Sequence, residues 1–174
     1  MADDHRESPP SGYRPHLIEY QELGSAGVAR WIDLRSEFAR ALDPVITSLG
    51  LAATVNTLLA HTGPGLEALG YLLMLRDGAS QDRAAGATLR ERLERVLVDI
   101  DGTVPFDGAT WVSNTVKTYN RLKHANRQPP EEVDVANAWR ECVLAVRAWV
   151  ALELGCPRSD RHAGGWADPG LQWV

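Results

Sequence analysis

Apolar residues in this chain recur at steps of three and four, the spacing that places side chains on one face of a helix. Between Val28 and Gly50 the pattern is carried by six side chains: Trp31, Leu34, Phe38, Leu42, Val45 and Leu49. No segment shows the apolar–polar alternation of a half-buried strand, and no internal repeat is visible. The sequence therefore predicts an all-α protein, a bundle of four or five helices with short connections.

Glycine and proline divide this helical pattern. A break or kink is expected at Thr62-Gly63-Pro64-Gly65, because proline lacks a backbone donor and disfavours helix in the residue before it. Ser80 is a candidate N-cap, and Gly155 with Pro157 ends the last helix. The predicted helical segments cover about residues 28–50, then 51–61 and 66–76 on either side of that break or kink, and then 81–100, 109–126 and 131–154.

Length and composition predict one globular domain with a core of its own. The chain has 174 residues, 44% of them hydrophobic and 24% charged, which is ordinary for a globular protein. Polar, proline-containing residues 1–16 are expected to form a flexible arm, residues 17–156 the helical domain, and residues 157–174 a flexible tail that contains Trp166 and Trp173. Trp173 is a candidate hydrophobic peg on the domain.

Charge and cysteine usage exclude several classes of protein. A formal net charge of −5 argues against a nucleic-acid coat or a polybasic membrane anchor, but it leaves room for a small basic site. No apolar run approaches the ~20 residues that a membrane span requires, and the start MADDHRESPP lacks the apolar region of a secretory signal. Two cysteines, Cys142 and Cys156, suggest reduced thiols. We therefore expect a cytoplasmic protein.

Metal ligands and catalytic thiols are not predicted. Asp99-x-Asp101-Gly102 lacks the alternating oxygen ligands and the distal Glu of a calcium loop. His61 has no other ligand-type residue at metal spacing, and Cys142 lies on the core stripe of its helix. No phosphate-binding glycine loop is present. The sequence predicts neither a metal nor a cofactor.

The segment Val116–Arg127 concentrates positive charge in this acidic chain, and it contains no Asp or Glu. On a helix at 100° per residue, an arc of roughly 80° contains five polar side chains: Ser113, Lys117, Asn120, His124 and Arg127. Such a face can hold a phosphate and move a proton, since an ordinary histidine titrates near neutral pH. A solvated helix face is the alternative that this segment alone leaves open.

Three features give the chain a likeness to a known family: Gly65-Leu66-Glu67-Ala68-Leu69 opening a buried helix, the run Tyr119-Asn120-Arg121-Leu122-Lys123-His124, and a closing helix through Leu154-Gly155. In these it resembles the HEPN domains, small helical bundles, many of which are metal-independent ribonucleases of defence and toxin systems. It is most similar to the HEPN domains that end ApeA-type anti-phage proteins. The likeness spans roughly residues 28–155.

The HEPN motif is an arginine, a polar residue that is often asparagine, three further residues and a histidine. Asn120 and His124 match it, whereas Tyr119 occupies the arginine position. The resemblance implies that His124 takes a proton from a ribose 2′-hydroxyl, and that Asn120 orients His124 or holds a phosphate oxygen. Lys117 is the candidate replacement for the arginine. As a point charge without the bidentate fork, it would weaken catalysis.

Other residues are predicted to support this site. Arg121, Lys123 and Arg127 are candidate RNA-binding cations. Tyr119 is expected to pack half-buried with its hydroxyl at the rim, with stacking on a base as a minority alternative. Glu67, in the most apolar helix, needs a partner: it pairs with the basic side chains or complements the helix dipole.

The predicted function is a HEPN-like, metal-independent endoribonuclease of a prokaryotic defence or toxin-type system. The resemblance implies RNA as substrate, a homodimer in which two motif helices face one cleft, and an antitoxin or defence-system partner. A catalytically degenerate dimerisation or RNA-binding module is the main alternative, and Tyr119 in the arginine position favours it. A regulatory protein that binds a nucleotide is a third.

Overall fold

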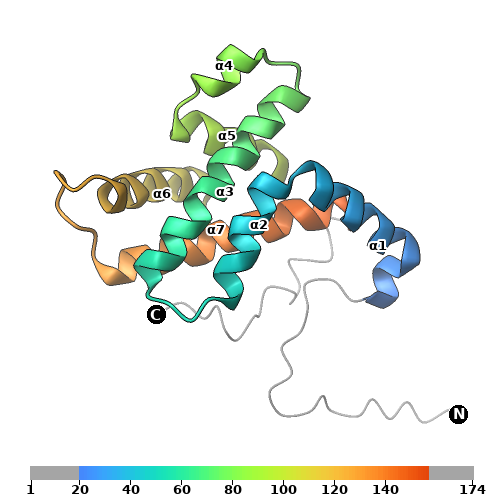
Figure 1. Cartoon of the computed structure of the whole chain (residues 1–174), viewed down its shortest axis with the longest axis horizontal. Coiled ribbons are helices and arrows are strands. Elements are labelled where there is room, and N and C mark those ends of the chain that lie inside the picture. Colours follow the sequence, from blue (N-terminus) through green and yellow to red (C-terminus); the bar gives the residue numbers. More distant parts are fainter. Residues whose placement is uncertain (1–19, 157–174) are drawn as a thin grey trace, which may run out of the picture.

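The computed structural model describes residues 20–156, and its described side chains begin at residue 23. The arm predicted at residues 1–16 and the tail predicted at residues 157–174, with Trp173, lie outside this range. Seven helices and no strand occupy the described residues (Figure 1). Their bounds are α1 Tyr20–Glu37, α2 Ala39–Gly50, α3 Val55–Arg76, α4 Gln81–Ala85, α5 Leu89–Ile100, α6 Gly108–Lys123 and α7 Glu132–Glu153. The predicted all-α bundle is confirmed.

The helix α3 is the centre of the bundle, in contact with α2, α4, α5, α6 and α7, and it crosses α7 in Figure 1. Its leucines at 59, 66, 69 and 73 are almost completely buried. The opposing helix α7 buries Cys142 and Trp149, and the Phe38 ring packs on that indole at 4.8 Å between centroids. The predicted core faces therefore meet as their spacing indicated.

The predicted break before Leu66 is wrong, because α3 continues through Pro64 from Val55 to Arg76. The two glycines beside the proline explain this. A side chain on Gly63 would meet the Tyr119 ring at 2.2 Å, and one on Gly65 would meet the Ala41 carbonyl at 2.6 Å. Close packing of α3 on α6 and α2 thus offsets the helix-breaking cost of an interior proline, about 3 kcal/mol.

Two helices predicted as continuous are each divided. The run from Val28 to Gly50 is interrupted at Phe38, between α1 and α2. The run that Ser80 begins forms α4 and α5, because Thr88 starts a new helix with a capping box in which its hydroxyl accepts from the Glu91 N–H. Ser80 caps α4 as predicted, by accepting from the Arg83 N–H. Apolar spacing alone predicts one helix here, and local capping divides it into two.

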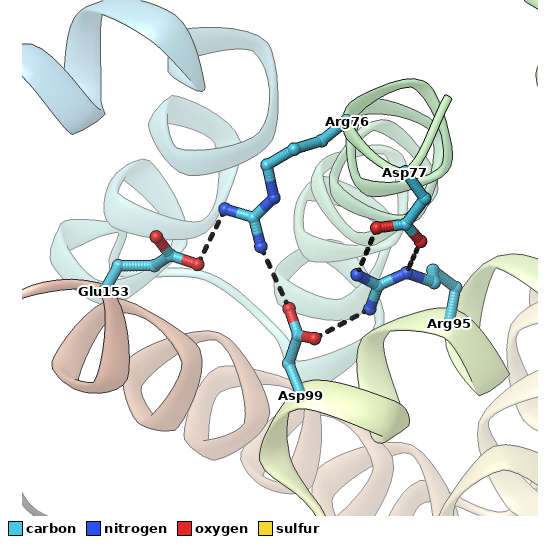
Figure 2. A network of polar contacts seen from close by, with 5 residues as sticks. All are labelled: Arg76, Asp77, Arg95, Asp99 and Glu153. Atoms are coloured by element: carbon cyan, nitrogen blue, oxygen red, sulfur yellow. Dashed lines mark hydrogen bonds and ion pairs between the residues drawn. The ribbon is translucent and has the colours of Figure 1, made fainter. Parts of the chain in front are cut away.

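A network of charged side chains joins the end of α3 to α5 and α7 (Figure 2). Arg76 donates to Glu153 at 2.7 Å and to Asp99 at 3.2 Å. Arg95 donates to Asp99 at 2.9 Å and forms a bidentate pair with Asp77. Each guanidinium therefore contacts two carboxylates, and Asp99 connects the two arginines.

Candidate functional site

The sequence-predicted site lies on α6 and on the turn that follows it. Asp107 caps this helix by accepting from the Thr110 N–H at 2.8 Å. Trp111, Val112 and Thr115 are buried on the face that packs against the core. The apolar side of α6 therefore fixes its polar side chains in register, and the last turn carries Asn120 and Lys123.

The prediction that α6 reaches Asn126 is wrong, because the helix ends at Lys123. The backbone of His124 is extended, with φ −113° and ψ 107°, while its N–H still donates to the Asn120 carbonyl. A turn follows, closed by the Arg127 N–H on the His124 carbonyl at 3.0 Å. No buried side chain follows Tyr119 in this segment, and Pro129 restricts the backbone beyond it, so nothing extends the helix.

The prediction that His124 and Arg127 share one helix face with Lys117 and Asn120 is therefore wrong, because both follow the end of α6. Both side chains are exposed on the turn. Six residues of helix, about 9 Å along the axis, separate Lys117 from the end of α6 at Lys123. The predicted catalytic set is therefore spread along α6 and past its end.

Tyr119 is more buried than predicted, with 6% of the residue exposed. Its ring lies against the backbone of Gly63, and it lines the same pocket as Glu67. Burial, together with the nearby Glu67 charge, raises the pKa of Tyr119 to about 12. The Lys123 ammonium lies 5.5 Å from the ring centroid. This ring is part of the core and offers little face for a base to stack on.

Glu67 connects α3 to two other helices through charge. Its carboxylate lies 3.6 Å from the Lys123 ammonium and 3.5 Å from the Arg92 guanidinium. Arg92 is held from the other side, since it also donates to the carbonyls of Ala84 and Ala85. The structure thus brings Glu67, Tyr119 and Lys123 together, all three of them predicted site residues.

These side chains border a pocket of 590 Å³ between α2, α3, α4, α5 and α6. Ten residues line it: Arg40, Pro64, Glu67, Ala68, Tyr71, Leu72, Ala85, Arg92, Tyr119 and Lys123. Three of these are cations and one is a carboxylate, so the pocket carries an excess of two positive charges. Its volume is that of a small-molecule site.

Three residues of the pocket were not predicted from the sequence: Arg40, Tyr71 and Arg92. The Arg92 guanidinium lies 5.9 Å from the Tyr71 ring centroid, and Arg40 has no ion-pair partner among residues 20–156. No local pattern marks these residues, since Arg92 belongs to a run of mixed charge on α5. Only the packing of α2 and α5 beside α3 brings them to the pocket.

Lys117 borders a separate pocket, of 150 Å³, between α6 and α7. Asp134, Asn137 and Glu141 of α7 line its other side. Burial raises the pKa of Glu141 to about 7, and the Asn137 Oδ1 atom is buried without a hydrogen-bond partner in the described structure. Lys117 is therefore a neighbour of α7, whereas Lys123 is a neighbour of α3.

A protein-family model described as Apea-like HEPN matches residues 76–160, from the last residue of α3 through α7. This chain carries a HEPN domain related to ApeA. The predicted resemblance is confirmed, although the match begins at Arg76 and not at Val28. The search of curated proteins and the search of solved structures each gave no match.

The matched part of the HEPN domain contains the motif helix, with Asn120 and His124, but it leaves out α2 and nearly all of α3. Glu67 and Arg40 therefore reach the pocket from outside the matched residues. No helix within residues 20–156 is long and apolar enough to cross a membrane, and these residues contain no group of three or more His, Cys, Asp or Glu side chains arranged to hold a metal ion.

Proposed function

We propose that this HEPN domain is a metal-independent endoribonuclease in which His124 is the general base. One observation carries the proposal: the imidazole of His124 is exposed on a turn beside Arg121, Lys123 and Arg127, in a segment from Ala109 to Pro130 that contains no carboxylate. A phosphodiester that approaches this turn meets positive charge and a proton acceptor together.

The chemistry follows from that placement. His124 removes the proton of a ribose 2′-hydroxyl, the 2′-oxygen forms a bond to the adjacent phosphorus, and the bond to the 5′-oxygen breaks. The leaving 5′-oxygen takes up a proton, and the products are a 2′,3′-cyclic phosphate and a 5′-hydroxyl. Asn120 lies one turn before His124 and holds a phosphate oxygen or the imidazole. Arg121, Lys123 and Arg127 neutralise the phosphates.

The adjacent pocket gives the RNA a place for a neighbouring nucleotide. Lys123 belongs both to the last turn of α6 and to the pocket lining. Arg40 supplies a cation at the same pocket, and the Tyr71 ring supplies an aromatic wall. A phosphate on the cations and a base on the wall is the usual division of contacts for single-stranded RNA.

Assembly and biological setting belong to the same proposal. A homodimer in which two α6 helices face one cleft would double the positive charge on the RNA. A prokaryotic defence or toxin-type system, with an antitoxin or other defence partner, is the setting that the HEPN resemblance favours. Light scattering at high micromolar concentration tests the dimer, and a monomer there would contradict the shared cleft.

The decisive experiment compares RNA cleavage by the wild-type chain, His124→Ala and His61→Ala. His61 is an exposed histidine on α3 that does not line the pocket, so its variant controls for loss of an imidazole. We expect activity in EDTA with cyclic-phosphate ends, a loss of about 100- to 10,000-fold in His124→Ala, and no loss in His61→Ala. Products with 5′-phosphate ends, or equal rates in both variants, would contradict the mechanism.

A second function is favoured by the position of Tyr119. This residue replaces the motif arginine, its ring is buried, and the Glu67 charge lies near it. Lys117, the predicted replacement, lies beside α7. A module that binds RNA without cleaving it would fit this arrangement. It would show RNA binding that Lys123→Ala weakens, with no turnover in the wild type or in any variant.

Lys117 separates the two functions further. If it supplies the missing charge in the transition state, Lys117→Ala should reduce cleavage nearly as far as His124→Ala. The reverse substitution, Tyr119→Arg, is a poor test, because a charged side chain would have to replace a buried ring packed on Gly63. Single-turnover cleavage by Lys117→Ala, beside its RNA affinity, is the cleaner measurement.

A further inference from the structure

An apolar groove of 530 Å³ lies between α1, α2 and α7, and it contributes nothing to the proposed RNA site. Its walls include Leu23 and Trp31 of α1, Ile46 and Leu49 of α2, Val150 of α7, and Leu154 directly after α7. Ile46 is 40% exposed and Leu49 is 53% exposed. A hollow of this size, lined by large apolar side chains, is typical of a surface that something covers.

The chain leaves the end of α7 beside this groove. Leu154 is 5% exposed and is part of the groove wall. Gly155 follows with φ +86°, a left-handed conformation that turns the chain away from the helix. The guanidinium of Arg30, on α1, lies 3.3 Å from where a side chain on Gly155 would begin. The described chain thus ends at Cys156, where α1 approaches the end of α7.

Eighteen residues, 157–174, follow that point, and four of the last nine are large and apolar: Trp166, Leu171, Trp173 and Val174. Trp166 is ten residues beyond Cys156, a tether of up to about 33 Å. The stretch that lines the groove from Val146 of α7 to Leu154 is about 12 Å long. Both tryptophans can therefore reach every part of the groove.

We propose that residues 157–174 of the same chain cover the groove, with the rings of Trp166 and Trp173 as anchors. Each indole offers a large rigid apolar surface at little entropic cost, which suits a hollow of this kind. The tether raises the effective concentration of the segment at the groove to the millimolar range. Docking then needs only weak intrinsic affinity.

Other occupants fit the same surface less well. A second copy in a two-fold dimer would bring an identical hollow against this one, and two hollows do not fill each other at protein packing density. In residues 1–19 the large aliphatic side chains apart from Met1 are Leu17 and Ile18, three and two residues before α1. These two aliphatic side chains offer less rigid apolar surface than the two indoles of residues 157–174.

The test uses the full chain labelled with 5-fluorotryptophan. Trp166→Phe and Trp173→Phe assign the two segment signals in the fluorine NMR spectrum. We expect both signals to lie away from the position of free 5-fluorotryptophan and to move toward it in Leu49→Asp. Trypsin cleavage after Arg158 or Arg161 should become several-fold faster in the same variant.

Val98→Asp is the matched control, because it adds the same charge at a 69% exposed side chain on α5; it should move neither signal. The signals of the buried Trp111 and Trp149 report that each variant is folded. Free-position signals in the wild type, or displaced signals that Leu49→Asp leaves unchanged, would overturn the proposal. So would displacement that appears only at concentrations where light scattering detects a dimer, since a second copy would then cover the groove.

Discussion

Two clusters of positive charge in this molecule have opposite surroundings. At the end of α3, Arg76 and Arg95 each contact two carboxylates, and Asp99 joins them (Figure 2). At the end of α6, Arg121 and Arg127 have no ion-pair partner among residues 20–156. The first cluster uses its charge within the fold, whereas the second leaves its charge available to a ligand.

The difference shows that density of cations does not identify a nucleic-acid surface. The α4–α5 region carries more arginines than α6, yet Arg83, Arg90, Arg92 and Arg95 each meet a carboxylate within 4 Å. Counter-charge decides the role of each side chain. Lys123 lies between the two cases, since Glu67 is 3.6 Å away but half of the lysine side chain is exposed.

The largest effect on stability is expected in the paired cluster. Arg95→Met should lower the free energy of unfolding by about 2 kcal/mol, because the 16% exposed side chain loses charged hydrogen bonds to Asp77 and Asp99. The control Arg90→Met removes a 49% exposed partner of Glu94 at 3.8 Å and should cost less than about 0.5 kcal/mol. Urea unfolding measures the free-energy loss in both variants. Equal losses would contradict the idea that Arg95 stabilises the fold more than a surface-paired arginine does.

Acid should reduce the difference in stability between wild type and Arg95→Met. The hydrogen bond from Arg95 lowers the pKa of Asp77 below its ordinary value of 3.8. The contribution of a carboxyl with a lowered pKa is present above the ordinary pKa and is lost as the pH falls through the folded-state value. The gap between wild type and Arg95→Met should therefore narrow below about pH 3.8.

A smaller loss is expected where α3 meets the site helix. In Gly63→Ala the new methyl group would lie 2.2 Å from the Tyr119 ring. Overpacking costs about 1–3 kcal/mol and the gain in helix propensity returns up to about 1 kcal/mol, so a net loss near 1 kcal/mol is expected. Gly50→Ala, with nothing within 4 Å, is the control, and thermal unfolding should show no loss there.

The helix faces could be predicted because burial on one side follows from spacing alone. Phe38, Leu42 and Val45 were assigned to one helix face by their spacing, and all three are buried. The path of the backbone through Pro64 could not be predicted, because it depends on Gly63 and Gly65 packing against helices distant in sequence. Local propensity is a weak guide where tertiary packing competes with it.

The candidate site, too, could be predicted only in part from the sequence. Asn120 and His124 were found from a short motif, but the end of α6 depends on where burial stops after Tyr119. The contact of Glu67 with Arg92 joins residues 25 positions apart (92 − 67) on different helices. Arg40 reaches the pocket only through the packing of α2 on α3. No local sequence pattern contains that information.

The carboxyl of Glu141 forms no ion pair among residues 20–156 and is shielded from water by burial. It should change the melting temperature by a few degrees in a pH-dependent way. Burial raises the pKa of Glu141 from 4.5 to about 7. Its contribution to stability is complete below pH 4.5 and is lost as the pH rises toward 7. Glu141→Gln should therefore match the wild-type melting temperature at pH 4.5 and exceed it at pH 8. The exposed Glu132→Gln, on the same helix, should show no such divergence.

The smallest effect tests the unpaired cluster directly, through the salt dependence of RNA binding. Arg127→Ala should weaken binding several-fold at low salt and reduce the slope of log affinity against log salt by about 0.7, the value for one contact to a single strand. Arg90→Ala removes the same charge from a cation that contacts Glu94, and it should leave the slope unchanged. Because net charge changes equally in both variants, general electrostatic attraction predicts equal slopes. A lower slope in Arg127→Ala alone would assign the RNA contact to the turn after α6, and equal slopes would mean that counter-charge does not distinguish the two regions.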